Sequence, residues 1–133
     1  MTSILTVLPD FLLDFAVATG LAVLYLVVYT FATAHNEFAL IRRNVPSAAL
    51  ALGLSLVGFA IPLSSAMVFS ATFLDLVLWG LVALLVQIAI YAIVRVLIPD
   101  LSPRIAKGEI APALFLGAAS VAAGLVNASA MRF

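Results

Sequence analysis

The stretch "SAALALGLSLVGFAIPLSSAMVF" (residues 47–69) is an apolar run of 23 residues without a charged side chain. A helix of about 20 apolar residues spans the roughly 30 Å hydrocarbon core of a bilayer. Small residues recur within the run at helical steps of three and four, which lets a second backbone approach one face closely. The stretch therefore predicts a transmembrane helix that packs tightly against a neighbour.

Three further apolar segments accompany this run, at residues 11–33, 73–97 and 111–131. The 133-residue chain is 66% hydrophobic and 9% charged, whereas a soluble domain carries roughly 25% charged residues. A soluble fold of this length cannot bury so much apolar surface. Strict alternation of apolar and polar residues is absent, so helices fit better than the strands of a barrel. We expect one all-α domain, residues 1–133, with four transmembrane helices in a lipid bilayer.

An internal repeat is visible in the spacing of identical residues. Residues 41–67 align with residues 105–131 at a constant offset of 64, and Ser65-Ala66-Met67 then matches Ser129-Ala130-Met131. Each unit contains two crossings, which predicts two parallel two-helix repeats, about residues 11–69 and about residues 73–131.

Glycines indicate which helices meet at the centre. Burial of apolar surface cannot drive helix association in lipid, so small residues that permit close packing take that role. The segments at 47–69 and 111–131 carry most of them, and we expect these two helices to form the central seam. The expected packing positions are Gly53, Gly58, Gly117 and Gly124.

The distribution of basic residues predicts the orientation. Most of them lie in or beside the two longer loops, at Arg42, Arg43, Arg95, Arg104 and Lys107. Basic loops face the cytoplasm. Both longer loops are therefore expected to be cytoplasmic and both termini periplasmic.

Composition also narrows the function classes. The chain has one histidine and no cysteine, which leaves no thiolate nucleophile and no zinc site of the usual kind. We expect no enzyme activity, no metal and no cofactor. A formal net charge of zero gives no basic face for nucleic acid, which is not an expected partner.

Four motifs resemble a known family. "HNEFALIRRN" (35–44), "AALALG" (48–53), "GFAIPLSSA" (58–66) and "GLVNASAM" (124–131) are similar to the YjfL-like inner-membrane proteins, domain of unknown function 350. The resemblance implies a four-helix protein of the bacterial inner membrane built from a duplicated two-helix unit. It implies no activity, because none is assigned to the family. The motif positions that carry over are His35, Asn36, Glu37, Arg42, Asn44, Gly53, Gly58, Pro62, Ser64, Ser65 and Asn127.

The first loop holds a candidate polar cluster: His35, Asn36, Glu37, Arg42 and Asn44. Histidine titrates near neutral pH, and the glutamate is a candidate cation ligand. We expect Arg42 and Arg43 to keep Glu37 ionised, because a nearby opposite charge favours the carboxylate. The alternative is a short amphipathic turn at the membrane interface without a function of its own.

A second group of candidates lies within the membrane, at Pro62, Ser64, Ser65 and Asn127. Two functions remain open. A structural or accessory protein that binds other subunits predicts that Ser64, Ser65 and Asn127 satisfy one another in a dry seam. An oligomeric pore or carrier for a small solute predicts that they face a wet cavity. Either function makes a homo-oligomer, or assembly with other membrane subunits, the expected partner state.

Overall fold

The computed structural model describes residues 2–33 and 35–133, and all of its regular structure there is helical. Six helices follow one another along the chain: α1 Thr2–Ala32, α2 Glu37–Arg42, α3 Pro46–Phe69, α4 Phe73–Leu97, α5 Leu101–Ala106 and α6 Ile110–Ala130. Four of them, α1, α3, α4 and α6, are long and apolar enough to cross a membrane. The all-α fold with four membrane-spanning helices is thus confirmed.

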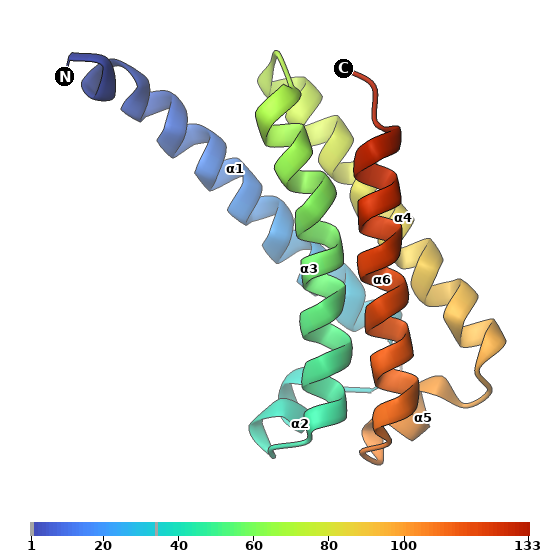
Figure 1. Ribbon diagram of the computed structural model, residues 1–133. Coiled ribbons are helices and arrows are strands. Elements are labelled where there is room, and N and C mark those ends of the chain that lie inside the picture. Colours follow the sequence, from blue (N-terminus) through green and yellow to red (C-terminus); the bar gives the residue numbers. More distant parts are fainter. Residues whose placement is uncertain (1, 34) are drawn as a thin grey trace.

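The arrangement places α3 and α6 side by side; α4 packs against both of them, and α1 packs against α3 and α4 (Figure 1). The short helices α2 and α5 lie together at one end of the bundle, and the chain termini and the α3–α4 turn lie at the other (Figure 1). A long helix, a six-residue helix and a second long helix follow one another twice in the chain. The two-helix repeat itself stays a prediction.

Glycine determines how closely α3 and α6 approach. A Cβ atom added at Gly58 would lie 2.3 Å from the Ser120 carbonyl oxygen, and one at Gly124 would lie 2.1 Å from the Gly58 carbonyl oxygen. At Gly117 it would lie 2.5 Å from Leu54 Cδ1. The seam between these two helices therefore requires residues without a side chain.

The packing role expected for Gly53 is wrong. This residue is exposed, and an added Cβ would meet nothing within 4 Å. Gly53 and Gly117 are equivalent in the sequence alignment, but they do not face the same kind of neighbour. A glycine in the sequence shows that a second helix could approach closely at that position. Whether a helix lies there depends on the direction in which the glycine faces.

The first helix begins nine positions earlier than expected, at Thr2 rather than residue 11. The helix runs through Pro9, which is its eighth residue. A proline inside a helix removes the hydrogen bond to the carbonyl four residues earlier, here that of Leu5, and α1 continues in spite of this loss. The start of α4 agrees with expectation, since the Thr72 hydroxyl caps it by accepting from the Asp75 amide at 3.1 Å.

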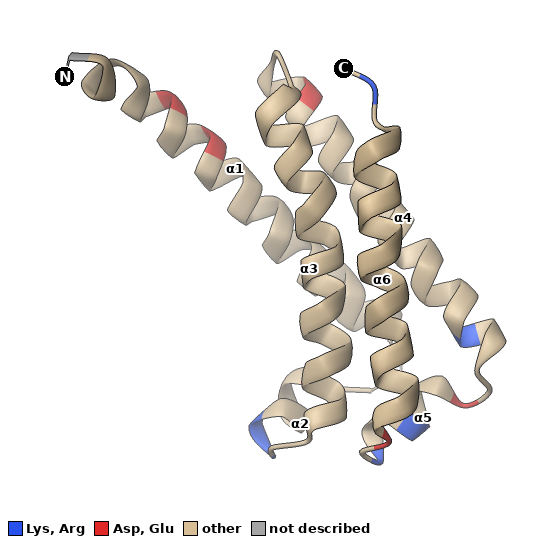
Figure 2. Cartoon of the chain, viewed as in Figure 1, with Lys and Arg blue, Asp and Glu red and all other residues tan. Residues whose placement is uncertain are grey.

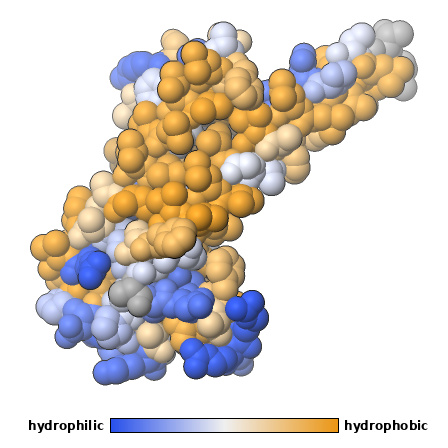
Figure 3. Space-filling view, turned by 180° about the vertical axis from the view of Figure 1, so that it is seen from behind, coloured by the Kyte–Doolittle hydropathy of each residue, from blue (hydrophilic) through white to orange (hydrophobic). Residues whose placement is uncertain are grey.

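The distribution of hydrophobic and hydrophilic side chains on the surface agrees with a protein that spans a membrane. Hydrophobic side chains cover the body of the bundle and much of α1, and hydrophilic side chains gather at the end formed by α2 and α5 (Figure 3). Basic residues lie mainly at that end, whereas acidic residues are divided between that end and the opposite one, where they lie on the outer half of α1 and at the start of α4 (Figure 2). The two ends of the bundle therefore carry different charge.

Candidate functional site

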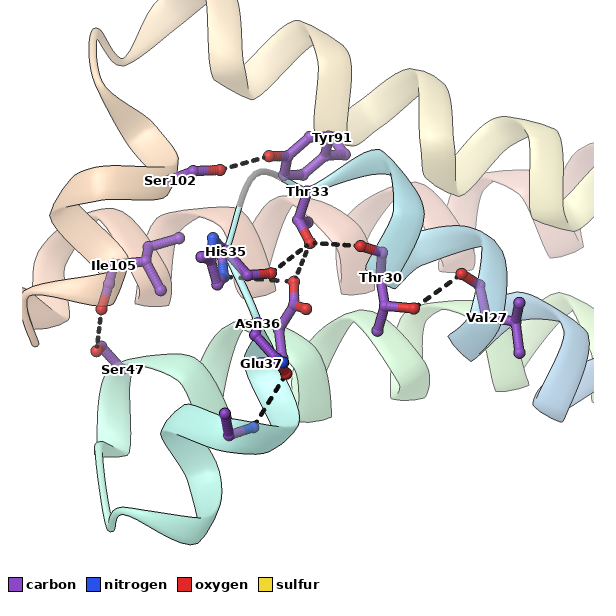
Figure 4. Close-up of polar contacts among 11 residues, drawn as sticks. Val27, Thr30, Thr33, His35, Asn36, Glu37, Ser47, Tyr91, Ser102 and Ile105 are labelled. Atoms are coloured by element: carbon purple, nitrogen blue, oxygen red, sulfur yellow. Dashed lines mark hydrogen bonds and ion pairs between the residues drawn. The ribbon is translucent and has the colours of Figure 1, made fainter.

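The turn after α1 folds back under the bundle and encloses an acidic side chain. Glu37 is the first residue of α2, and Asn36 caps this helix by accepting from the Ala39 amide at 3.1 Å. The cap fixes the start of α2 so that the Glu37 side chain points toward α1, where the Thr33 hydroxyl donates to its Oε1 atom (Figure 4). Glu37 is 0% exposed. A residue expected in an interfacial loop is thus part of the protein interior.

His35 lies beside this carboxyl. Its Nε2 atom is 3.3 Å from Glu37 Oε1, but neither ring nitrogen has a hydrogen-bonding partner, and Glu37 Oε2 has none either. Burial raises the pKa of the Glu37 carboxyl, and the Thr33 hydrogen bond opposes that rise. Burial lowers the pKa of His35. The pair is therefore held in surroundings that favour its uncharged forms.

The expectation that Arg42 and Arg43 keep Glu37 ionised is wrong. Both arginines are exposed, and no ion pair joins either to Glu37 within the part of the chain that the structure describes. Six-residue α2 places Arg42 in its last turn and Glu37 in its first, on different sides of the helix. Asn44 is also exposed, with a left-handed backbone (φ 64°) that turns the chain into α3. Of the candidate polar cluster, the structure brings together His35 and Glu37, with Asn36 as the cap.

Above this turn, polar side chains connect the helices through the bundle interior. The Ser55 and Ser120 hydroxyls are 3.3 Å apart across the α3–α6 seam, and Gln87 Nε2 donates to the Ser120 carbonyl oxygen at 3.0 Å. Nearer the α2–α5 end, the Tyr91 and Ser102 hydroxyls are 2.8 Å apart (Figure 4). We call these residues, with Tyr25 and Tyr29, the inner polar network.

Several atoms of this network lack a partner. The hydroxyls of Tyr25 and Tyr29 lie near Ser55 but reach no hydrogen-bonding geometry, and Gln87 Oε1 also has no partner. Their rings are held by stacking: Tyr25 lies parallel to Phe59 at 4.6 Å, and Tyr29 meets Tyr91 edge-on at 5.7 Å. Unpaired polar groups are costly inside a membrane protein, so a further hydrogen bond to any of these atoms would stabilise the bundle.

The other candidate positions within the membrane do not form one site. Pro62 is buried in the bundle, Ser64 is exposed, and Ser65 and Asn127 are half-buried. Among the described residues, no hydrogen bond joins the three polar side chains, so the mutual satisfaction that the structural alternative predicted for them is wrong. Asn127 Nδ2 has no partner, and this residue lines a shallow apolar pocket between α4 and α6.

Sequence reasoning missed the polar role of the residues around Thr33. Tyr25, Tyr29 and Thr33 follow one another at steps of four, which places them on one face of a helix. That face is buried against α3 and α4. The polar stripe in an otherwise apolar helix was the available signal, but nothing local indicated that Glu37 folds back onto it.

The comparisons with known proteins agree on one family. The family model described as "Domain of Unknown Function (DUF350)" matches residues 3–131. The chain is 37% identical over 119 residues to "UPF0719 inner membrane protein YjfL" of Escherichia coli (strain K12), a match that covers 90% of each chain. The protein of the same name from Escherichia coli O157:H7 shows the same identity and coverage. No solved structure shows significant similarity to the chain.

Proposed function

Since the chain belongs to the DUF350 family, an uncharacterised family of membrane proteins, we propose that it is a structural or accessory subunit that assembles with other copies of itself. Enzyme activity, cofactors and nucleic-acid partners form no part of the proposal. This proposal rests on the outer half of α1. This half diverges from the bundle (Figure 1) and carries acidic residues that form no ion pair within the described part of the chain.

The proposed location is the bacterial inner membrane, as the name of the E. coli relatives states for those proteins. In the proposed orientation, the end formed by α2 and α5 faces the cytoplasm, because basic loops do so. Both termini and the α3–α4 turn are then periplasmic.

Cysteine labelling tests this orientation. The natural chain has no cysteine, so each introduced thiol is the sole target. We expect Asn44→Cys and Lys107→Cys to resist a membrane-impermeant maleimide added to intact cells and to react after lysis. Thr72→Cys is expected to react in intact cells. The reverse pattern would overturn the orientation.

The outer half of α1 has few contacts within the chain. Its buried residues begin at Ala18 and continue with Leu21, Tyr25 and Tyr29, whereas residues 3–13 are all exposed. Figure 1 shows this part of α1 diverging from the bundle toward the N-terminus. Exposed apolar side chains are normal for a helix in lipid and do not by themselves indicate a partner. The polar residues on this segment are therefore the evidence to consider.

Asp10 and Asp14 continue, at steps of four, the face of α1 that is buried further along at Ala18. No ion pair involves either acid within the part of the chain that is described. Charged residues at membrane depth are costly unless they find a partner. Arg132 lies at the same end of the bundle, and its guanidinium donates to backbone carbonyls of its own segment, at 3.3–3.4 Å.

Charge complementarity therefore supports a second copy as the partner of this segment. Arg132 of one copy would meet Asp10 and Asp14 of the next, and the apolar side chains of α1 would cover helices of that neighbour. Arginine and carboxylate pair strongly where water is scarce. Two copies can make this contact reciprocally in a two-fold dimer, and successive copies can make it head to tail in a ring or a chain.

Charge reversal tests the contact. Native mass spectrometry of the protein released from nanodiscs is expected to show oligomers for the natural chain and predominantly monomers for Arg132→Asp. The same loss is expected for Asp10→Arg combined with Asp14→Arg. Because the surface pairs only between copies, mixing the two kinds of variant should restore oligomers.

Asp75→Asn is the matched control, because Asp75 lies at the same end and belongs to the cap region of α4. Its oligomers should persist. Oligomers that survive both charge reversals would exclude the proposed contact. A natural chain that is monomeric alone but binds another membrane protein would also exclude self-assembly.

A pore or carrier for a small solute is the second candidate. The unpaired hydroxyls of Tyr25 and Tyr29 and the unpaired Gln87 Oε1 favour it, because they offer hydrogen bonds to water or a polar solute. Reaction of Gln87→Cys with a small water-soluble thiol reagent would support this function. A thiol that stays unreactive in the folded oligomer would favour the structural role.

A further inference from the structure

The Glu37 carboxyl is enclosed and incompletely paired. The side chain is 0% exposed, Oε1 accepts from the Thr33 hydroxyl, and Oε2 has no partner. A buried carboxylate needs compensating donors or a counter-ion, whereas a protonated carboxyl carries no charge. The unpaired oxygen is thus the natural position for a proton.

Among the described residues, no lysine or arginine forms an ion pair with this carboxyl. From α1 the titratable neighbour is Tyr29, which in turn contacts Tyr91 of α4. The polar side chains near this end from α3 and α5 are Ser47 and Ser102, which carry no charge. Arg42 and Arg43 of α2 are exposed, and Arg104 of α5 pairs with Glu109 at 2.9 Å.

The imidazole of His35 completes the site. Its side chain is 5% exposed, and Nε2 lies 3.3 Å from Glu37 Oε1. A pocket of about 430 Å³ adjoins the pair and is lined by Thr30, Phe31, Thr33, His35, Asn36 and Phe38. Thr33 and His35 therefore belong both to this pocket and to the immediate surroundings of the carboxyl.

We propose that Glu37, His35 and Thr33 form a proton-binding site at the end of α1, loaded through this pocket. Loading moves one proton from hydronium in the pocket to a Glu37 carboxyl oxygen and leaves a water molecule. His35 stays neutral, and the Thr33 hydroxyl donates to the ionised form once the proton leaves. This inference does not depend on the proposed assembly.

Burial raises the pKa of Glu37 and lowers that of His35, which agrees with a neutral pair. The contribution of Glu37 to stability is full below its unfolded-state pKa and is lost as pH rises through the raised folded-state pKa. The contribution of His35 is present above its unfolded-state pKa and is lost as pH falls through the lowered folded-state pKa. Both contributions coexist only where Glu37 is protonated and His35 is neutral.

A hydrophobic carbodiimide tests the site, because it reacts with protonated carboxyl groups and not with carboxylates. Natural protein in lipid vesicles is treated with dicyclohexylcarbodiimide at a series of pH values, and modification of each acidic residue is measured by peptide mass spectrometry. We expect Glu37 to be modified up to a higher pH than Glu109, which is exposed and paired with Arg104. Glu37 that is unmodified at every pH, or that follows the profile of Glu109, would overturn the proposal.

Two threonine variants distinguish a proton site from general burial. Thr33→Val removes the hydroxyl that donates to Glu37, so the pH profile of Glu37 modification should move upward by roughly one unit, the size expected for one hydrogen bond to a charged group. Thr30→Val is the matched control, because Thr30 lines the same pocket but its hydroxyl donates to the Val27 carbonyl oxygen. Its profile should match that of the natural protein. Equal profiles for the two variants would count against the assigned role of Thr33.

Discussion

Replacing Gly58 or Gly124 with leucine is expected to destabilise the bundle strongly. A Cβ at either position would lie 2.1–2.3 Å from a backbone carbonyl oxygen of the facing helix. A backbone atom cannot rotate away as a side chain can, so α3 and α6 must separate along the seam. Overpacking of a core typically costs 1–3 kcal/mol, and we expect more than about 3 kcal/mol here because the obstruction is backbone. Thermal unfolding followed by circular dichroism in detergent measures the loss.

Gly53→Leu is the matched control, because it adds the same side chain to the same helix at a position with open space around it. Its unfolding temperature should stay near that of the natural protein. Destabilisation by Gly53→Leu equal to that by Gly58→Leu would mean that the seam is placed on the wrong face of α3.

Phe59→Ala is expected to have the second largest effect. The ring is 0% exposed and stacks on Tyr25 at 4.6 Å, which joins α3 to α1. Lipid does not reach this site, so removal of the ring leaves a cavity and cancels the stacking contact. Comparable deletions in protein cores cost about 3–5 kcal/mol. Unfolding in a sodium dodecyl sulfate titration, followed by the fluorescence of Trp79, measures this change.

Phe115→Ala is the control for Phe59→Ala. Phe115 belongs to α6 and is 50% exposed, so its ring faces lipid and its loss leaves no enclosed cavity. We expect little change in its unfolding midpoint. An equal midpoint for the two alanine variants would show that the Tyr25–Phe59 contact does not hold α1 to the bundle.

The transmembrane helices were predictable because lipid imposes a length and a composition that are visible along the chain. The segment expected at residues 73–97 and helix α4 coincide, and α3 and α6 each begin within one residue of expectation. The seam glycines at 58, 117 and 124 were predictable from spacing, since close approach needs small residues. The exposed position of Gly53 was not predictable, because composition does not show which face of a helix is turned toward its neighbour.

The candidate site was predictable only in part. His35 and Glu37 attracted attention as polar residues in an apolar chain, and the structure places them together. Their enclosure was not predictable, because it depends on how α2 folds back under α1. Pairing of Glu37 with Arg42 or Arg43 followed from sequence proximity, whereas a six-residue helix turns those side chains to different sides. The electrostatics of the site depend on the direction in which each side chain points in the folded protein, which sequence spacing does not give.

Cross-linking between two copies tests the proposed assembly most directly. Asp10→Cys and Arg132→Cys are made in separate, differently tagged chains, which have no other cysteine, and are produced together in the same membrane. A short bismaleimide is expected to join the two kinds of chain, while either variant alone gives no cross-linked product. A chain that carries both substitutions should give a cross-linked dimer when the contact is reciprocal, and a ladder of multimers when it is head to tail. No cross-link between the two kinds of chain, or cross-linking of Asp10→Cys to itself, would contradict assembly through α1.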